Sequence, residues 1–191
     1  MRFRCICMFA LLFVLVVVAA TPVFAQNGAV TTGPPIHDNP TYAIRAGVMF
    51  PQGSTQSNTL FSAGVEIFGP MSAMNASTSG GLTLSADYVP VKTSDGAGGT
   101  KTVSLIPVLL GWEGHSTVGQ SGSTVDLGLG VGVYWATDTI PDMNITNTVN
   151  FAYGASIGYH FTPSWFVQGR FLANGNESKD GLIGVELGYQ Y

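Results

Sequence analysis

Charged residues are scarce in this chain. Lys, Arg, Asp and Glu together make up 9% of its 191 residues, whereas a water-soluble domain usually carries about 25%. Because a surface that meets water needs charged side chains, most of this surface is expected to face something other than water. Hydrophobic residues account for 46% of the chain and glycine for 25 positions, which agrees with that expectation.

Long hydrophobic runs are missing beyond residue 20. A membrane-spanning helix needs about 20 apolar residues in succession, and no later segment supplies them. Backbone N–H and C=O groups in lipid must be hydrogen-bonded within the protein, which leaves a closed β-barrel as the alternative to helices. The composition therefore predicts strands that cross a membrane and close on themselves.

Cysteine is nearly absent, and both cysteines lie close to the N-terminus. Cys5 and Cys7 belong to an apolar run over 5–20, which two arginines precede. A basic start, a short apolar stretch and a small residue after it, here Ala25, are typical of a secretory signal peptide. We interpret residues 1–25 as a cleaved signal peptide, so the mature chain is expected to have no thiol and no disulfide.

An uncleaved anchor helix is the alternative for this segment. It is disfavoured because the run is short for a membrane span and Pro22 follows it directly. Loss of Arg2 and Arg4 with the signal leaves five basic residues against 11 acidic ones, a net charge of about −6. An acidic chain without a basic cluster argues against nucleic-acid binding.

Turn-rich and apolar-patterned segments alternate after the signal. Residues 26–40 are polar and rich in proline, and we interpret them as a flexible leader. The chain then predicts an all-β fold over 41–191, an up-and-down antiparallel transmembrane barrel of about eight strands. The strands are expected near 41–51, 59–69, 82–92, 101–112, 124–136, 148–161, 165–174 and 182–191.

The strongest signal is alternation with a period of two residues, as the last segment shows. Ile183, Val185 and Leu187 alternate with Gly184 and Glu186, and successive side chains of a strand point to opposite faces. A soluble sandwich or a lipocalin-like barrel would alternate in the same way. Its water-facing side would be rich in Lys, Glu, Thr and Ser, whereas glycine dominates here, which suits the narrow interior of a small barrel.

The six charged residues within the bodies of the predicted strands all have the parity opposite to the apolar face, and the remaining charges lie in loops or at strand ends. A basic side chain facing lipid costs about 2–4 kcal/mol at the middle of the bilayer, which explains the exclusion. We expect an inward network that fills the lumen and blocks a continuous water path, with two arginines facing two glutamates and two aspartates nearby. Its members are Arg45, Glu66, Asp87, Asp126, Arg170 and Glu186.

Segment 101–112 has two competing outer faces, one containing Leu105 and Leu109 and the other ending in Leu110 and Trp112. We favour the face that ends in Trp112. Aromatic residues fall near both ends of the predicted strands, where headgroup-level rings are expected. With both termini in the periplasm, one girdle comprises Tyr42, Trp112, Phe161, Trp165 and Tyr191, and the other Phe50, Phe61, Tyr88, Trp135 and Phe151.

Two stretches resemble a known group of proteins. Residues 154–165, GASIGYHFTPSW, resemble the penultimate hairpin of OmpA-like and opacity-protein-like barrels, and residues 184–191, GVELGYQY, resemble the C-terminal assembly signal of outer-membrane barrels. The resemblance implies a bacterial outer-membrane location and an assembly role for Tyr189 and Tyr191. It further implies contact with outer-membrane lipid, lipopolysaccharide and the barrel-assembly machinery. The chain departs from the group in a short first extracellular loop and in lacking a peptidoglycan-binding domain after the barrel.

Candidate chemistry is sparse. The histidines are expected to be scattered, with His37 in the leader, His115 in a periplasmic turn and His160 low on the sixth strand, so we predict no metal site and no cofactor. Ser156 shares the lumen face with His160, away from lipid. We therefore expect a non-enzymatic outer-membrane protein with a structural or adhesion-like surface-contact role. The alternatives are a narrow channel or transporter of small hydrophobic molecules, and a lipid-A-modifying enzyme.

Cleavage after Ala25 should give a mature N-terminus at Gln26, because the apolar run and its small-residue flank match what signal peptidase reads. N-terminal sequencing of protein extracted from the outer membrane measures this. A chain that keeps residues 1–25 and fractionates with the inner membrane would contradict the interpretation.

Overall fold

The computed structural model describes residues 39–52, 59–74, 77–95, 98–118, 123–140, 145, 148–175 and 181–191. The predicted signal peptide, and the predicted leader apart from its last two residues, lie outside this part. Within the described ranges, no helix is long and apolar enough to span a membrane.

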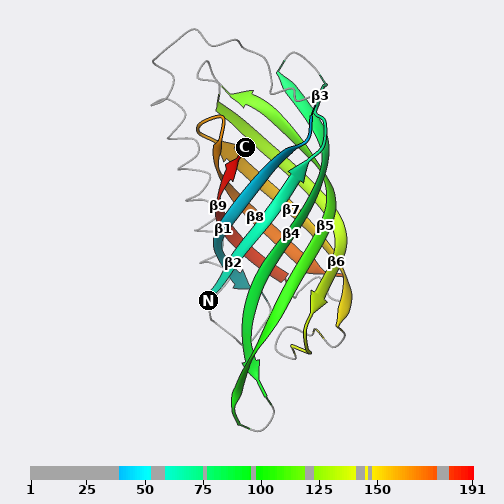
Figure 1. Ribbon diagram of the computed structural model, residues 1–191, viewed down its shortest axis with the longest axis vertical. Helices are drawn as coiled ribbons and strands as arrows, with labels where there is room; N and C mark the ends of the chain where they lie inside the picture. Colours follow the sequence, from blue (N-terminus) through cyan, green and yellow to red (C-terminus); the bar gives the residue numbers. More distant parts are fainter. Residues whose placement is uncertain are drawn as a thin grey trace.

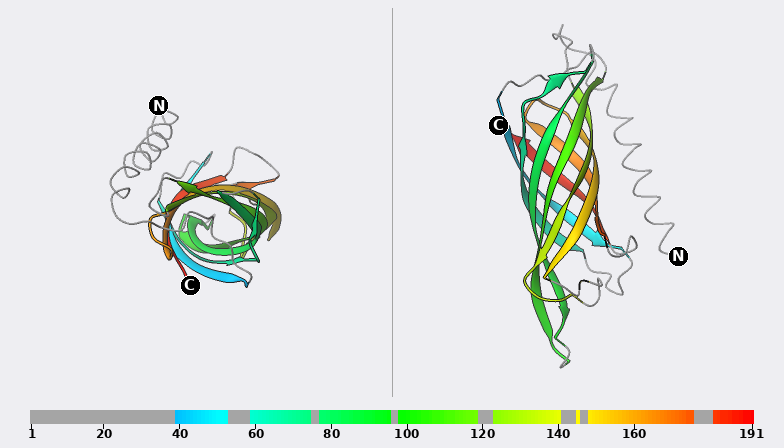
Figure 2. Two further views of the ribbon diagram at one scale, coloured as in Figure 1. Left: turned by 90° about the horizontal axis from the view of Figure 1, so that it is seen from above. Right: turned by 90° about the vertical axis from the view of Figure 1, so that its right-hand side faces the viewer.

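The described residues form one antiparallel sheet that closes into a barrel of eight strands (Figures 1 and 2). Strands that follow one another in the sequence are neighbours around the barrel. The pairing of β1 with β9 and of β2 with β4 closes the sheet. A two-residue strand, β3, adds to the edge of β4. The strands are β1 (Thr41–Pro51), β2 (Leu60–Phe68), β3 (Ser72–Ala73), β4 (Thr78–Ser94), β5 (Thr100–Val118), β6 (Ser123–Ala136), β7 (Val149–His160), β8 (Trp165–Asn174) and β9 (Gly181–Gln190). The predicted fold class is thereby confirmed.

The two ends of the barrel differ. Thr41 and Gln190 lie at one end, which we call the terminal end, and the connections there over 119–122 and 161–164 are short. The opposite end, the hairpin end, carries the long β4–β5 hairpin at the bottom of Figure 1. It also carries the longer β6–β7 connection over 137–148.

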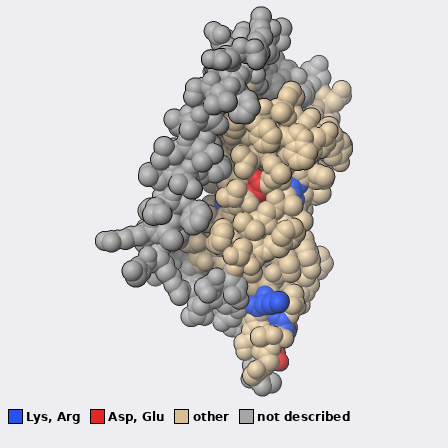
Figure 3. All heavy atoms as spheres, turned by 90° about the vertical axis from the view of Figure 1, so that its left-hand side faces the viewer, with Lys and Arg blue, Asp and Glu red and all other residues tan. Residues whose placement is uncertain are grey.

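The outer face is a band of apolar side chains, as the alternation predicts. Leu129 is 70% exposed, and Leu110 and Trp112 are exposed while Leu105 and Leu109 are buried. The prediction that the face of segment 101–112 ending in Trp112 points outward is thus confirmed. The part of the surface drawn in tan in Figure 3 carries few charges, and lysines gather toward the hairpin end.

Aromatic rings flank this band. Trp165 and Tyr189 contact each other edge to face at the terminal end, with ring centroids 5.0 Å apart, and Tyr42 stacks on Tyr191 at 6.1 Å. Phe61 is exposed at the other border of the band. Amphipathic rings are favoured at the headgroup level of a membrane, so the band and its borders fit a bilayer.

Strands β4 and β5 extend well beyond the predicted segments. β4 already begins at Thr78, and β5 continues to Val118 instead of ending at Trp112. Once a strand leaves the lipid, both of its faces can carry polar residues, so the alternation stops although the backbone ladder continues. For this reason the prediction that His115 lies in a turn is wrong, since the residue is paired with Asp126 inside the β5–β6 ladder.

Leu129→Arg should reduce the stability of the inserted barrel by roughly 2–4 kcal/mol, because it places a cation on the lipid face of β6. Unfolding by urea in lipid vesicles, followed by heat-modifiable gel migration, measures the change. Thr102→Arg, on the exposed part of the hairpin, is the matched control and should leave the midpoint unchanged. Equal midpoints for the two variants would contradict a lipid-facing β6.

Candidate functional site

The interior of the barrel is the candidate site, because buried polar side chains gather there. Three regions follow one another along the lumen. Histidines and carboxylates lie toward the terminal end, arginines and carboxylates in the middle, and apolar side chains toward the hairpin end.

Arg45 on β1 is the centre of the middle region. Its side chain is fully buried, and Nη1 pairs with Glu66 on β2. Nη2 donates to Asp87 Oδ1 at 2.9 Å, and Nε lies 3.0 Å from Glu186 Oε2. One guanidinium therefore meets carboxylates from three strands, and its planar set of five donors suits such an arrangement.

Arg170 on β8 approaches the same carboxylates from the other side. Its Nη1 donates to Asp87 Oδ2 at 2.7 Å and to Glu186 Oε2 at 3.3 Å. Ser62 adds a hydrogen bond to Glu186 Oε1 at 2.8 Å. Taking an ion out of water costs several kcal/mol, which is offset only when geometry and further hydrogen bonds are good, and these contacts meet that requirement.

A small amount of space is left on the glycine-rich side of the network. A cavity of about 30 Å³ is lined by Glu66, Glu113 and Arg170 together with glycines of β5, β6 and β7. A volume of this size holds one or two water molecules. Water there can solvate the charges locally, but the space is far too small for a continuous pore.

The second polar region is formed by β5, β6 and β7. Asp126 lies between two histidines: Oδ1 is 2.7 Å from His115 Nδ1 and Oδ2 is 2.9 Å from His160 Nε2. Glu113 Oε1 lies 3.1 Å from the other ring nitrogen of His115. All four side chains are buried, so the arrangement combines two imidazoles and two carboxylates away from water.

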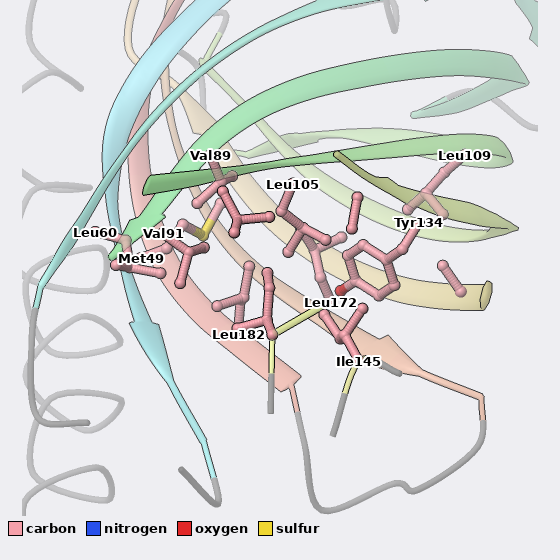
Figure 4. Close-up of a cluster of buried hydrophobic side chains, with 14 residues drawn as sticks. Met49, Leu60, Val89, Val91, Leu105, Leu109, Tyr134, Ile145, Leu172 and Leu182 are labelled. Atoms are coloured by element: carbon pink, nitrogen blue, oxygen red, sulfur yellow. The ribbon is translucent and has the colours of Figure 1, made fainter. Parts of the chain in front are cut away.

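Apolar side chains close the lumen at the hairpin end (Figure 4). Met49, Val89, Leu105 and Leu182 are each completely buried and share one cluster with Tyr134. From the β6–β7 connection, Ile140 and Ile145 join the same cluster and exchange two backbone hydrogen bonds. This end is thus filled by packed hydrocarbon.

The structure divides the six residues of the predicted lumen network. It brings Arg45, Glu66, Asp87, Arg170 and Glu186 together, whereas Asp126 contacts the two histidines instead. His115 and Glu113 were missed because the predicted strand ended at Trp112. The period-two pattern itself could have found them, since both have the parity of the inward positions on β5.

Ser156 and His160, which share the inward parity of β7, do not form a catalytic pair. They are four residues apart on one strand, and a rise of about 3.3 Å per residue separates them by roughly 13 Å. His37 lies outside the described residues.

A closed barrel of eight antiparallel strands, with an apolar outer band between aromatic rings, defines a transmembrane β-barrel of the outer-membrane type.

No protein-family model and no curated protein matches the chain. Among solved structures it is similar to the outer membrane enzyme PagL, with a TM-score of 0.60 and 18% identity over 78% of this chain and 97% of that chain. A de novo designed transmembrane β-barrel has a TM-score of 0.46 and 11% identity, covering 82% of this chain and all of that one. Ail of Yersinia pestis has a TM-score of 0.43 and 10% identity over 80% and 99%.

The likeness to PagL concerns the fold, and it corrects one prediction. We expected a protein without enzymatic activity, but the same barrel carries an enzyme in PagL, so this fold does not exclude catalysis. The likeness to PagL supports the fold, a small closed β-barrel. The narrower resemblance to OmpA-like and opacity-protein-like barrels stays a prediction.

Glu186→Ala should destabilise the barrel by about 3–5 kcal/mol, because it leaves buried Arg45 and Arg170 short of a partner. Urea titration monitored by heat-modifiable gel migration measures the shift. Asp138→Ala removes a carboxylate that pairs with Lys101 at the surface and should barely move the midpoint. If both variants unfold at the same urea concentration, the buried network does not stabilise the barrel.

Proposed function

We propose that the protein is a closed barrel of the bacterial outer membrane that contacts other surfaces through its β4–β5 hairpin. The observation that carries the proposal is the shape of this hairpin. β4 pairs with β2 only up to Tyr88, and β5 pairs with β6 only from Leu105, so residues 89–94 of β4 and 100–104 of β5 form a two-stranded ribbon of their own. Six residues of β4 follow Tyr88, which at about 3.3 Å each extend the ribbon by up to roughly 20 Å.

The ribbon has a packed base and a polar tip. Val91 and Val103 are buried in the apolar cluster at its base, which holds it upright on the barrel. Toward the tip, Lys92 and Thr102 are exposed, and Lys101 pairs with Asp138 at 2.5 Å. The hydrogen bond from Lys101 keeps the pKa of the Asp138 carboxyl below its ordinary value, so this carboxylate is ionised at neutral pH.

The orientation of the barrel follows from its connections. Outer-membrane barrels have short periplasmic turns and longer extracellular loops, and the two shortest connections between the long strands of this chain, from β5 to β6 and from β7 to β8, lie at the terminal end. The hairpin end therefore faces the outside of the cell, beside the lipopolysaccharide leaflet. The predicted signal peptide supports export to this membrane.

A channel or transporter is the less favoured alternative. The arginine–carboxylate network crosses the middle of the lumen, and the apolar cluster fills its outer end. A pathway for ions or hydrophobic molecules would have to displace both regions, and opposing charges held within 3 Å or so in a low-dielectric interior resist separation.

Shortening the hairpin tests the proposal. Replacing residues 93–101 by Asn-Gly joins Lys92 to its partner Thr102 through a type I′ turn, which suits the twist of two antiparallel strands. Cells that display this variant should attach to cultured epithelial cells several-fold less than cells with the wild-type protein, at equal levels of folded barrel. Attachment is counted by microscopy, and folding is verified by heat-modifiable migration.

Lys92→Gln combined with Lys101→Gln serves as the control that keeps the length of the hairpin and removes its positive charge. Attachment lost only on shortening assigns contact to the ribbon as a whole, and attachment lost in both variants assigns it to the lysines. Undiminished attachment of the shortened variant would refute the proposal. Stable single-channel steps of the wild-type protein in a planar bilayer would favour the channel instead.

A further inference from the structure

Buried charge in this barrel does not balance. Among the described residues the interior holds two guanidinium groups, Arg45 and Arg170, and five carboxylates. Three of the carboxylates contact the arginines. Within the described part of the chain, the remaining two, Glu113 and Asp126, form ion pairs with histidine rings alone, and isolated charges in such a site are strongly disfavoured. The histidine region therefore needs positive charge from protons or from a cation.

The hydrogen-bonding geometry of this region is incomplete. His115 Nε2 and Asp126 Oδ1 are both buried, and neither makes an aligned hydrogen bond within the described part of the chain. Each has a partner close by, Glu113 at 3.1 Å and His115 Nδ1 at 2.7 Å, respectively. The two atoms of each pair are close enough for a hydrogen bond, but their relative orientation does not allow an aligned one. Buried polar atoms are nearly always satisfied, so the unsatisfied Asp126 Oδ1 points to a group that completes the site.

We propose that His115, Asp126 and His160 bind one divalent transition-metal ion of the Zn²⁺ class, with Glu113 holding the His115 ring at its other nitrogen. Ligand atoms of His115, Asp126 and His160 all lie within 4.8 Å of one another. Zn²⁺ takes imidazole nitrogen and carboxylate oxygen at about 2.0–2.2 Å in a tetrahedral arrangement, so two of its ligands lie about 3.4 Å apart. The three donors would therefore approach one another by up to about 1.4 Å on binding, and a water molecule would take the fourth position.

Charge and ligand type agree with this ion. One divalent cation neutralises Glu113 and Asp126 while both imidazoles stay neutral and coordinate through their lone pairs. Imidazole suits Zn²⁺, Cu²⁺ and Ni²⁺, whereas Mg²⁺ and Ca²⁺ prefer all-oxygen sites. Two imidazolium ions would neutralise the same carboxylates, and the experiment below separates the two outcomes.

The barrel holds these donors in place. Phe166 stacks on the His160 ring at 4.8 Å, and Phe68 contacts the His115 ring edge to face at 6.1 Å. Gly158 lies opposite Asp126 in the β6–β7 register, where a Cβ would come within 2.8 Å of Asp126 Oδ2. Glycine there leaves room for the carboxylate between the histidines, so the donors are oriented before any ion arrives.

Metal binding to the full-length barrel in detergent tests the inference. Metal-depleted protein is dialysed against Zn²⁺, and bound metal is measured by mass spectrometry of the dialysed samples. Co²⁺ is used in parallel, because its visible absorption reports nitrogen and oxygen ligands. We expect one Zn²⁺ per chain and a Co²⁺ band that saturates at one equivalent.

Asp126→Asn and His160→Gln should each weaken binding by at least about tenfold, since even changes around a ligand shell cost 10–100-fold. His37→Gln removes the third histidine and should change nothing. Heat-modifiable migration selects folded variants, and if neither site variant folds, the wild-type stoichiometry decides. Less than a tenth of an equivalent of Zn²⁺ on the wild-type barrel, or full binding by folded Asp126→Asn and His160→Gln, would overturn the proposal and leave protonated histidines as the source of positive charge.

Discussion

Hydrogen bonding of the backbone in lipid is the constraint on which the rest of this structure depends. An unpaired N–H or C=O group in hydrocarbon costs several kcal/mol, so the sheet has to close without an edge. The β1–β9 and β2–β4 registers complete that closure. Once the sheet is closed with only eight strands, the lumen is narrow, and every inward side chain has to find its partner among a few neighbours.

This narrowness explains the order of the interior. Long arginine side chains reach the carboxylates of three strands because glycines on the facing walls leave space for them. A Cβ on Gly64 would overlap the Asp87 carboxylate, and a Cβ on Gly47 would overlap the β9 backbone beside Glu186. The glycines that look like empty positions in the sequence are thus what permits the charges to pair.

The fold, and which side chains point inward or outward, could largely be predicted from the sequence, because side chains that face lipid have to be apolar. The alternation around Glu186 and Asp126 gave the inward face, and Leu110 and Trp112 lie on the outward face, as predicted.

The site was harder to predict. His115 was assigned to a turn because the alternation fades where β5 leaves the bilayer, although its backbone ladder continues. Asp126 was grouped with the arginines, since parity determines the face of a residue but not its height or its neighbour across the lumen. Catalytic activity was excluded on the scarcity of motifs, and the fold shared with PagL shows that such scarcity decides little.

The free edges of the ribbon have a consequence for how the protein meets its neighbours. A two-stranded extension exposes backbone groups that could add a strand from another molecule. Pro90 on β4 has no N–H to donate, and the charged Lys92 lies two residues further along the same strand. A proline and a lysine on an edge strand both disfavour edge-to-edge pairing. In a crowded membrane, where barrels collide constantly, these features disfavour sheet-like aggregation of the ribbon, and recognition at its tip falls to side chains.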